Sequence, residues 1–112
     1  MIKDPISYED FQKVDLRIGT ITEVQDFEKA KKPAYKLKVD FGVLGVKNSS
    51  AQLTALYTKE ELLGKQVIAV VNFSPRQIGN FMSEILVLGI QNQEEVVLLQ
   101  CRNQAKNGKI IS

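Results

Sequence analysis

The sequence contains no histidine, no tryptophan and one cysteine among its 112 residues. Without histidine it lacks the commonest general base, the usual partner of a nucleophilic serine and the commonest metal ligand. Cys101 alone forms neither an intrachain disulfide nor a paired-cysteine metal site, so we expect a reducing compartment and a buried, apolar role for this thiol. No glycine-rich loop of the GxxxxGK[ST] type is present. The sequence therefore predicts no enzymatic activity, no metal and no cofactor.

Long apolar runs are also missing. No stretch approaches the roughly 20 apolar residues that span a bilayer, and the start, MIKDPISYED, lacks the apolar core of a secretory signal peptide. We therefore expect a cytoplasmic protein without membrane insertion. The length predicts one domain over residues 1–112, since single cores commonly form from about 100–150 residues.

Two short helices are predicted from their capping residues. Ser7, followed three residues later by Asp10, has the spacing of a capping box. Thr58 and Glu61 repeat this spacing in TKEELLGKQ, where Gly64 provides a C-terminal stop. Each helix should have only one or two turns.

Alternation of apolar and polar residues predicts three strands in the first half of the chain. In the first strand the apolar parity slips after Gly19, which indicates a bulge or sharp coiling. In the second strand Leu37, Val39 and Phe41 alternate with charged residues. The third strand lies within residues 46–56, and its outer face is polar but uncharged.

Three further strands are expected in the second half, over residues 66–73, 83–90 and 96–101. The order is then three strands, a short helix, two strands and an additional C-terminal strand. This order is typical of an OB-fold. We therefore predict an all-β protein with short helices, built as a five-stranded Greek-key OB-fold barrel with an N-terminal helix and a C-terminal extension.

The late strands carry more apolar residues than one barrel interior can cover. VIAVV, ILVLGI and VVLLQC are apolar at both parities, so each needs cover on two faces. A second copy of the chain would provide that cover. On this basis we expect a homodimer, with Val70 facing the partner subunit.

The segment NFSPRQIG, residues 72–79, follows the first of these apolar runs. We place it at or beside the subunit interface, with direct ligand contact and a plain turn as alternatives. Arg76 suits either a carboxylate across an interface or a phosphate. Asn72 and Gln77 can satisfy backbone groups at the strand ends.

A second concentration of polar residues lies on the early strands. Five of the ten residues in KAKKPAYKLK are lysine, which indicates either a solvated loop or a patch that faces phosphates. The early strands of an OB-fold usually carry its ligand surface. Those segments hold Arg17, Lys36, Lys38, Lys47, Asn48, Ser49, Ser50 and Gln52, and all of these except Asn48 are predicted RNA contacts. Because few aromatic side chains are available for stacking, a folded RNA recognised by its shape and backbone is favoured.

Five blocks in this order resemble the CsaA family over nearly the whole chain: FQKVDLRIGTI, KPAYKLKVDFG, KNSSAQL, QVIAVVNFSPRQIGNFMSEILVLG and NGKII. That family is similar to homodimeric tRNA-binding proteins and to the tRNA-binding C-terminal domains of some bacterial methionyl-tRNA synthetases. The resemblance implies an OB-fold homodimer that binds tRNA and assists protein export as a chaperone.

The resemblance also implies roles for individual residues. It adds Ser83 and Glu84 to the tRNA contacts, and it assigns Asn72, Pro75, Arg76 and Gln77 to the dimer interface. Phe73 is expected beside them. The leading hypothesis is thus a non-catalytic homodimer that binds structured RNA, above all tRNA. The alternative is an export chaperone that binds unfolded or preprotein polypeptides in an apolar groove near the dimer seam, formed by Phe73, Ile78, Phe81 and Met82.

Overall fold

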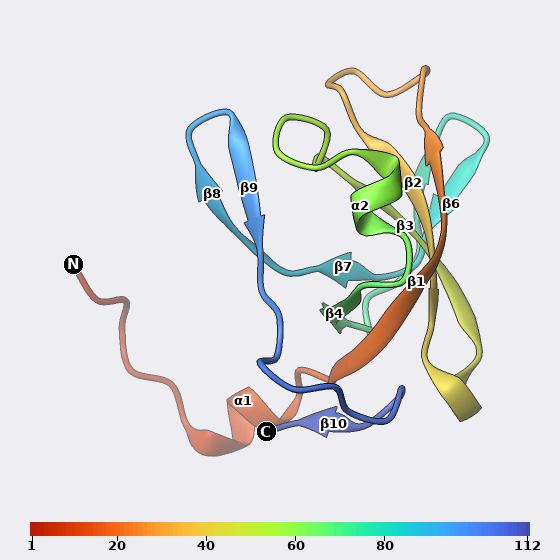
Figure 1. The fold of residues 1–112 in the computed structure, drawn as a ribbon. Coiled ribbons are helices and arrows are strands. Elements are labelled where there is room, and N and C mark those ends of the chain that lie inside the picture. Colours follow the sequence, from red (N-terminus) through yellow and green to blue (C-terminus); the bar gives the residue numbers. More distant parts are fainter.

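The computed structural model describes residues 1–112 and shows a small β-barrel with two short α-helices (Figure 1). The elements are, in chain order, α1 (Tyr8–Gln12), β1 (Leu16–Asp26), β2 (Tyr35–Asp40), the 3-10 helix η1 (Gly42–Leu44), β3 (Val46–Ala51), α2 (Lys59–Leu62), β4 (Gln66–Val70), β5 (Arg76–Ile78), β6 (Phe81–Ser83), β7 (Leu86–Val87), β8 (Gly89–Asn92), β9 (Glu95–Leu98) and β10 (Ile110–Ile111).

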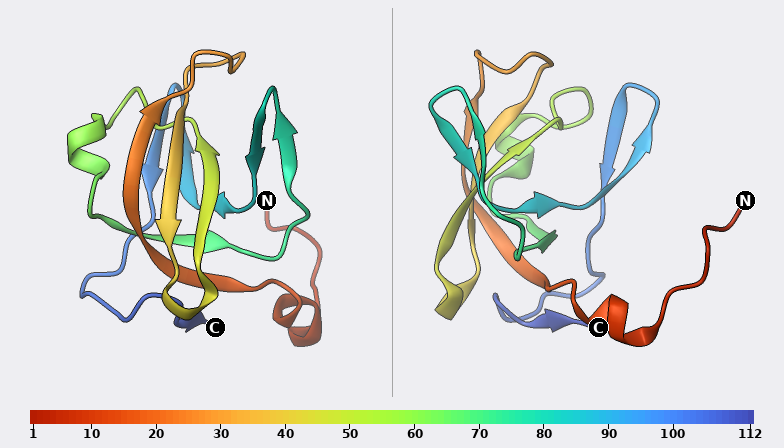
Figure 2. Two further views of the ribbon diagram at one scale, coloured as in Figure 1. Left: turned by 90° about the vertical axis from the view of Figure 1, so that its right-hand side faces the viewer. Right: turned by 180° about the vertical axis from the view of Figure 1, so that it is seen from behind.

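The main sheet has the order β3-β2-β1-β4-β7, and β10 pairs with β1. All of these neighbours are antiparallel. The sheet coils into a nearly closed barrel, while the hairpins β5–β6 and β8–β9 form two separate sheets (Figures 1 and 2). The predicted fold class is confirmed, including the N-terminal helix and the C-terminal extension.

The late strands differ from the three long strands predicted. β4 ends at Val70, and residues 83–90 are divided among β6, β7 and β8. The cause is a change of partner, because β7 pairs with β4 whereas β8 pairs with β9. Between them, the N–H of Leu88 still donates to the carbonyl oxygen of Ile68 at 2.9 Å. One straight strand cannot serve both sheets, so the chain bends here.

The core lies inside the barrel. Along β2 and the residue that follows it, buried apolar residues alternate with more exposed ones, as predicted. Val39 and Phe41 are both fully buried. A Cβ atom on Gly19 would lie 2.7 Å from Cγ1 of Val39 and 2.8 Å from the Phe41 ring. The bulge is not at this glycine, because the register of β1 against β2 shifts between Ile21 and Glu23. Gly19 is therefore required for close packing.

Both predicted capping boxes are present. The Ser7 hydroxyl accepts the N–H of Asp10 at 3.0 Å, and the Thr58 hydroxyl accepts the N–H of Glu61 at 3.1 Å. The Glu61 carboxylate accepts the N–H of Thr58 at 2.9 Å, and this backbone hydrogen bond lowers the pKa of Glu61. Gly64 follows α2 with a φ of +86°, which suits glycine at a helix end.

The two ends of the chain behave differently. Residues 1–6, which we call the N-terminal arm, stand away from the barrel, and Met1 and Ile2 are completely exposed (Figures 1 and 2). The C-terminal segment, which follows β9, is attached to the barrel by hydrogen bonds. For example, Gln66 Nε2 donates to the carbonyl oxygen of Ala105 at 2.6 Å. Cys101 in this segment is exposed, so the prediction that it is buried was wrong. Neither α-helix has the length and hydrophobicity of a membrane-crossing segment.

Candidate nucleic-acid interface

The strand register gathers polar side chains on the outer side of β1, β2 and β3. We call this surface the basic face, and its two cross-strand rows are Gln25, Lys36 and Ser50, and Glu23, Lys38 and Asn48. Leu37, between the two lysines, is buried in the core, so Lys36 and Lys38 lie on the opposite side of the sheet. Three of the predicted RNA contacts, Lys36, Lys38 and Ser50, thus come together with Asn48.

Neither lysine of the basic face forms an ion pair with a carboxylate. The Lys38 ammonium donates to Asn48 Oδ1 at 3.3 Å. The Lys36 ammonium lies 5.6 Å from the ring centroid of Phe27 and 5.8 Å from that of Phe81. Both positive charges therefore remain available to an anionic ligand, and phosphate groups are the anions that a nucleic acid offers.

Ser83 and Glu84 lie beside this face, but their side chains close the barrel. The Ser83 hydroxyl accepts the N–H of Ser50 at 3.0 Å. The Glu84 carboxylate accepts the N–H of Asn48 at 2.9 Å, and the Glu84 N–H donates to the Asn48 carbonyl oxygen at 2.8 Å. These contacts satisfy the outer edge of β3 in place of a neighbouring strand. The structure thus gives both residues a role in supporting β3.

Ser49 and Lys47 lie on the other side of β3, because successive strand residues alternate between faces. Ser49 is fully buried, and its hydroxyl lies 3.4 Å from the carbonyl oxygen of Ile85. We therefore remove Ser49 from the predicted RNA contacts. Lys47 is half-buried and pairs with Val39, a core residue, so it does not join the basic face. Gln52 is exposed but follows the end of β3.

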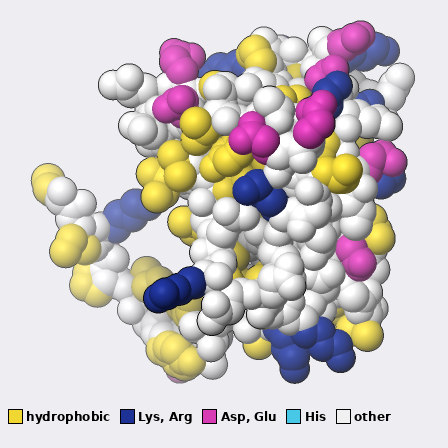
Figure 3. All heavy atoms as spheres, viewed as in Figure 1, with side chains coloured by type: hydrophobic (Ala, Val, Ile, Leu, Met, Phe, Trp, Pro, Cys, Tyr) yellow, Lys and Arg dark blue, Asp and Glu magenta, His cyan; other side chains and the backbone are white.

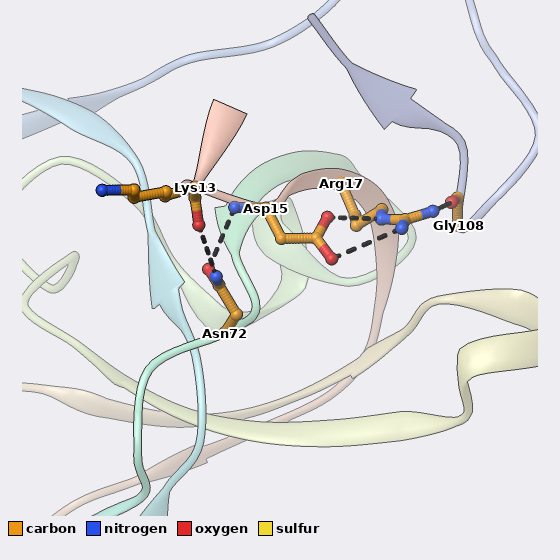
Figure 4. Close-up of polar contacts among 5 residues, drawn as sticks. All are labelled: Lys13, Asp15, Arg17, Asn72 and Gly108. Carbon is orange, nitrogen blue, oxygen red and sulfur yellow. Dashed lines mark hydrogen bonds and ion pairs between the residues drawn. The ribbon is translucent and has the colours of Figure 1, made fainter. Parts of the chain in front are cut away.

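Arg17 is also separate from the basic face, because it lies at the opposite end of β1 from Glu23 and Gln25. Figure 4 shows its polar contacts. Its guanidinium donates to both carboxylate oxygens of Asp15, at 2.6 and 3.3 Å, and to the carbonyl oxygen of Gly108 at 3.0 Å. The hydrogen bond to Asp15 raises the pKa of Arg17. The guanidinium thus joins β1 to the C-terminal segment. This geometry favours a structural role over the predicted RNA contact, and the Arg17→Ala variant discussed below tests between the two.

Asn72 completes the same polar network from the other side (Figure 4). Its Oδ1 accepts the N–H of Asp15 at 2.9 Å, and its Nδ2 donates to the carbonyl oxygen of Lys13 at 2.7 Å. Gln77 similarly donates to the carbonyl oxygen of Gly79 at 3.0 Å. The prediction that Asn72 and Gln77 satisfy backbone groups is confirmed.

Val70 does not have the exposure expected of a residue facing a partner subunit. It is 6% exposed, because β4 lies between β1 and β7 and Val70 pairs with Leu16 and Leu86. We therefore remove Val70 from the predicted interface. Pro75 and Arg76 are exposed, as is Phe73 at 57%.

A large groove of about 1180 Å³ lies between the hairpin β5–β6, the hairpin β8–β9 and the lysine-rich loop after β1. Figure 2 shows the two hairpins standing apart at the two ends of β7 when the molecule is seen from behind. Two of the residues predicted for a polypeptide groove, Phe73 and Ile78, line it together with Arg76. Phe81 lies instead beside the basic face, and Met82 is exposed and does not line the groove. The predicted groove is therefore only partly brought together.

Sequence reasoning missed three residues of the basic face and its surroundings: Glu23, Gln25 and Phe27. The continued alternation of β1 beyond the bulge could have indicated the first two. No comparable sequence signal placed Phe27 against Phe81, because that contact joins the end of β1 to a separate hairpin.

Comparisons with known proteins identify the family of this chain and support its fold. The family described as "Putative tRNA binding domain" matches residues 16–110. The structure is similar to the chaperone CsaA of Bacillus anthracis, with a TM-score of 0.92 and 48% identity over 97% of this chain and 100% of that chain. It is also similar to the CsaA chaperone protein of Picrophilus torridus, with a TM-score of 0.90 and 52% identity over 96% and 100% of the two chains.

A methionine–tRNA ligase of Leptospira biflexa is 37% identical over 106 residues. This match covers 95% of the present chain and 15% of the ligase, so the chain spans only a small part of that relative. The family match, in contrast, extends over most of the barrel and reaches β10. The chain therefore belongs to the tRNA-binding domain family.

Proposed function

We propose that this protein is a non-catalytic, cytoplasmic homodimer whose single domain binds structured RNA, and tRNA in particular. The observation that carries the proposal is the pair of lysines without carboxylate partners on the basic face of a tRNA-binding domain. Asn48 and Ser50 add hydrogen-bonding groups that suit sugars and base edges. The sequence, which lacks histidine, offers no general base of the commonest kind for chemistry on the RNA.

The electrostatic part of this proposal has a measurable signature. If each site neutralises about four phosphates, affinity falls with about the third to fourth power of the salt concentration. Binding of total tRNA is measured by fluorescence anisotropy over a series of salt concentrations. Lys38→Ala is expected to weaken binding and reduce the slope by about one, whereas the matched charge loss Lys106→Ala, in the C-terminal segment, leaves both unchanged. Equal effects of the two variants would refute the basic face as the binding surface.

The homodimer is supported by apolar side chains that one chain leaves uncovered. Hydrophobic side chains recur along the N-terminal arm and over the region of β8 and β9 (Figure 3). Phe73 and Ile90 are each 57% exposed, and Leu86 is 48% exposed. A second copy that covers these side chains would remove apolar surface from water. We include Pro75, Arg76 and Gln77 at this interface because they follow the exposed Phe73 closely in the chain, at the start of β5.

Sedimentation at micromolar concentration tests the dimer directly. We expect a species of twice the chain mass for the full chain, and a weaker dimer when residues 1–6 are removed, because the apolar side chains of the arm lose their place on the partner. The control is Lys3→Ala with Asp4→Ala, which changes the polar residues of the arm and keeps the apolar ones. A full chain that sediments as a single subunit would refute the homodimer.

A second function, polypeptide binding as an export chaperone, is favoured by one observation. The large groove offers Phe73 and Ile78 beside polar residues, and the two similar structures at about half identity are CsaA chaperones. An unfolded, reduced polypeptide is added to a preformed complex with labelled tRNA. Displacement at comparable concentrations would indicate one shared surface, whereas binding of both ligands would indicate separate ones. No binding of the polypeptide would refute the chaperone function.

A further inference from the structure

The hairpin β5–β6 places an aromatic ring beside the lysines of the basic face. Phe81 packs edge-on against Phe27, with ring centroids 5.4 Å apart and an interplanar angle of 65°. Phe27 is 7% exposed, whereas Phe81 is half-buried. Of the two rings, Phe81 therefore retains the surface that a ligand can contact.

A small pocket of about 200 Å³ opens at this point. Its lining residues are Glu23, Gln25, Lys36, Leu37, Lys38, Asn48 and Phe81. The volume is below the roughly 300–1,000 Å³ of sites for drug-sized ligands, and it suits one flat ring. The pocket combines an aromatic ring, two side-chain amides, a carboxylate and two ammonium groups. In an unpaired nucleotide, the base can stack on the ring, the base edge can bond to the amides and the carboxylate, and the phosphate can pair with the ammonium groups.

We propose that this pocket receives one unpaired base of the bound RNA, stacked on Phe81. The proposal rests on the RNA-binding function proposed above and makes it more specific. Lys36 now has its ammonium 5.8 Å from the Phe81 centroid, and on binding it moves from the ring to the phosphate of the inserted nucleotide. Glu23, whose carboxylate oxygens accept hydrogen bonds, favours a base edge with an amino group. Adenine, cytosine and guanine have such an edge, and uracil does not.

The stacking interaction is tested with total tRNA and the variants Phe81→Leu and Phe81→Tyr. Stacking on an aromatic ring contributes enough that its removal weakens binding by about 5-fold to 100-fold. We expect this loss for Phe81→Leu with an unchanged salt slope, because no charge is removed. Phe81→Tyr keeps a ring and should retain the wild-type affinity. Lys38→Ala provides the contrast, since it should reduce the salt slope by about one.

The base preference gives a second measurement that does not depend on the Phe81–Phe27 contact. Wild-type protein should bind 12-nucleotide oligomers of A and of C more tightly than the oligomer of U. Glu23→Gln, at an exposed position, should reduce this difference because the amide can also donate to uracil. If Phe81→Leu matches the wild type at every salt concentration and the oligomers bind equally, the pocket proposal is wrong while tRNA binding stands. If the wild-type protein binds no RNA, the proposed function itself is wrong.

Discussion

Replacement of Arg17 by alanine separates the structural role of this residue from an RNA contact. The change removes two hydrogen bonds to Asp15 and one to the carbonyl oxygen of Gly108. Hydrogen bonds to charged groups contribute about 1.5–3 kcal/mol when buried, and exposed ion pairs contribute about 0–1 kcal/mol. The Arg17 and Asp15 side chains are 25% and 32% exposed, so this pair is neither fully buried nor freely exposed. We therefore expect the free energy of unfolding to fall by about 2 kcal/mol.

For a chain of this size, that loss corresponds to a decrease of about 10 °C in Tm. Thermal unfolding is followed by circular dichroism at one fixed protein concentration, because association would otherwise shift the transition. The affinity for tRNA is measured well below the transition and should be unchanged. Lys38→Ala is the matched variant with the opposite expectation, namely a stability change within about 0.5 kcal/mol and a weaker complex.

This reasoning is refuted if Arg17→Ala leaves stability unchanged and weakens tRNA binding instead. An unchanged Tm together with weaker tRNA binding and a salt slope reduced by about one would identify Arg17 as a phosphate contact. The network in Figure 4 would then contribute little to stability, and the basic face would have to extend to the far end of β1.

Three other substitutions test the fold. Gly19→Ala forces a methyl group to within 2.7 Å of a core side chain, so urea unfolding should show a loss of about 1–3 kcal/mol; a stability equal to wild type would contradict the packing argument. Glu84→Ala removes the acceptor for the N–H of Asn48 and should cost about 1 kcal/mol and accelerate hydrogen exchange at that amide, whereas unchanged exchange would exclude a role in barrel closure. The hydrogen bond from the Thr58 N–H lowers the pKa of Glu61 from its ordinary value of 4.5. The stability advantage of the wild type over Glu61→Gln should therefore be present above about pH 4.5 and disappear as the pH falls through the lower folded-state pKa. A difference in stability that does not depend on pH would count against this assignment.

The elements governed by local rules were predictable from the sequence. The capping residues Ser7 and Thr58 begin the two helices where their spacing indicated. The alternation in β2 identified the buried Val39 and Phe41 correctly. In each case the decisive interaction lies within a few residues along the chain or follows from the two-residue period of a strand. The barrel itself followed from the order of these elements.

The exchange of partners in the late strands could not be read in the same way. The apolar run at residues 85–90 has no periodicity that shows where pairing with β4 stops and pairing with β9 begins. Arg17 presents a related difficulty, since a charged residue on an early strand suggests ligand binding until its partner is known. One partner, Asp15, lies only two residues away, but the other, the Gly108 carbonyl oxygen, is 91 residues away in the sequence. Ser49 is different, because its strand parity already placed it inside.

Barrel closure by side chains joins the two candidate binding surfaces of this protein. Ser83 and Glu84 hold the β3 edge behind the basic face, and both also line the large groove. A ligand on either surface that changes the geometry of this shared wall must change affinity at the other, and the two effects on binding free energy are equal by thermodynamic linkage. Removing the Glu84 carboxylate should therefore reduce any coupling between tRNA and polypeptide more than it reduces the binding of either alone. If coupling persists at full strength in Glu84→Ala, the Glu84 carboxylate does not carry it, and the backbone bond from Glu84 to Asn48 and the Ser83 hydroxyl remain as the connection to β3.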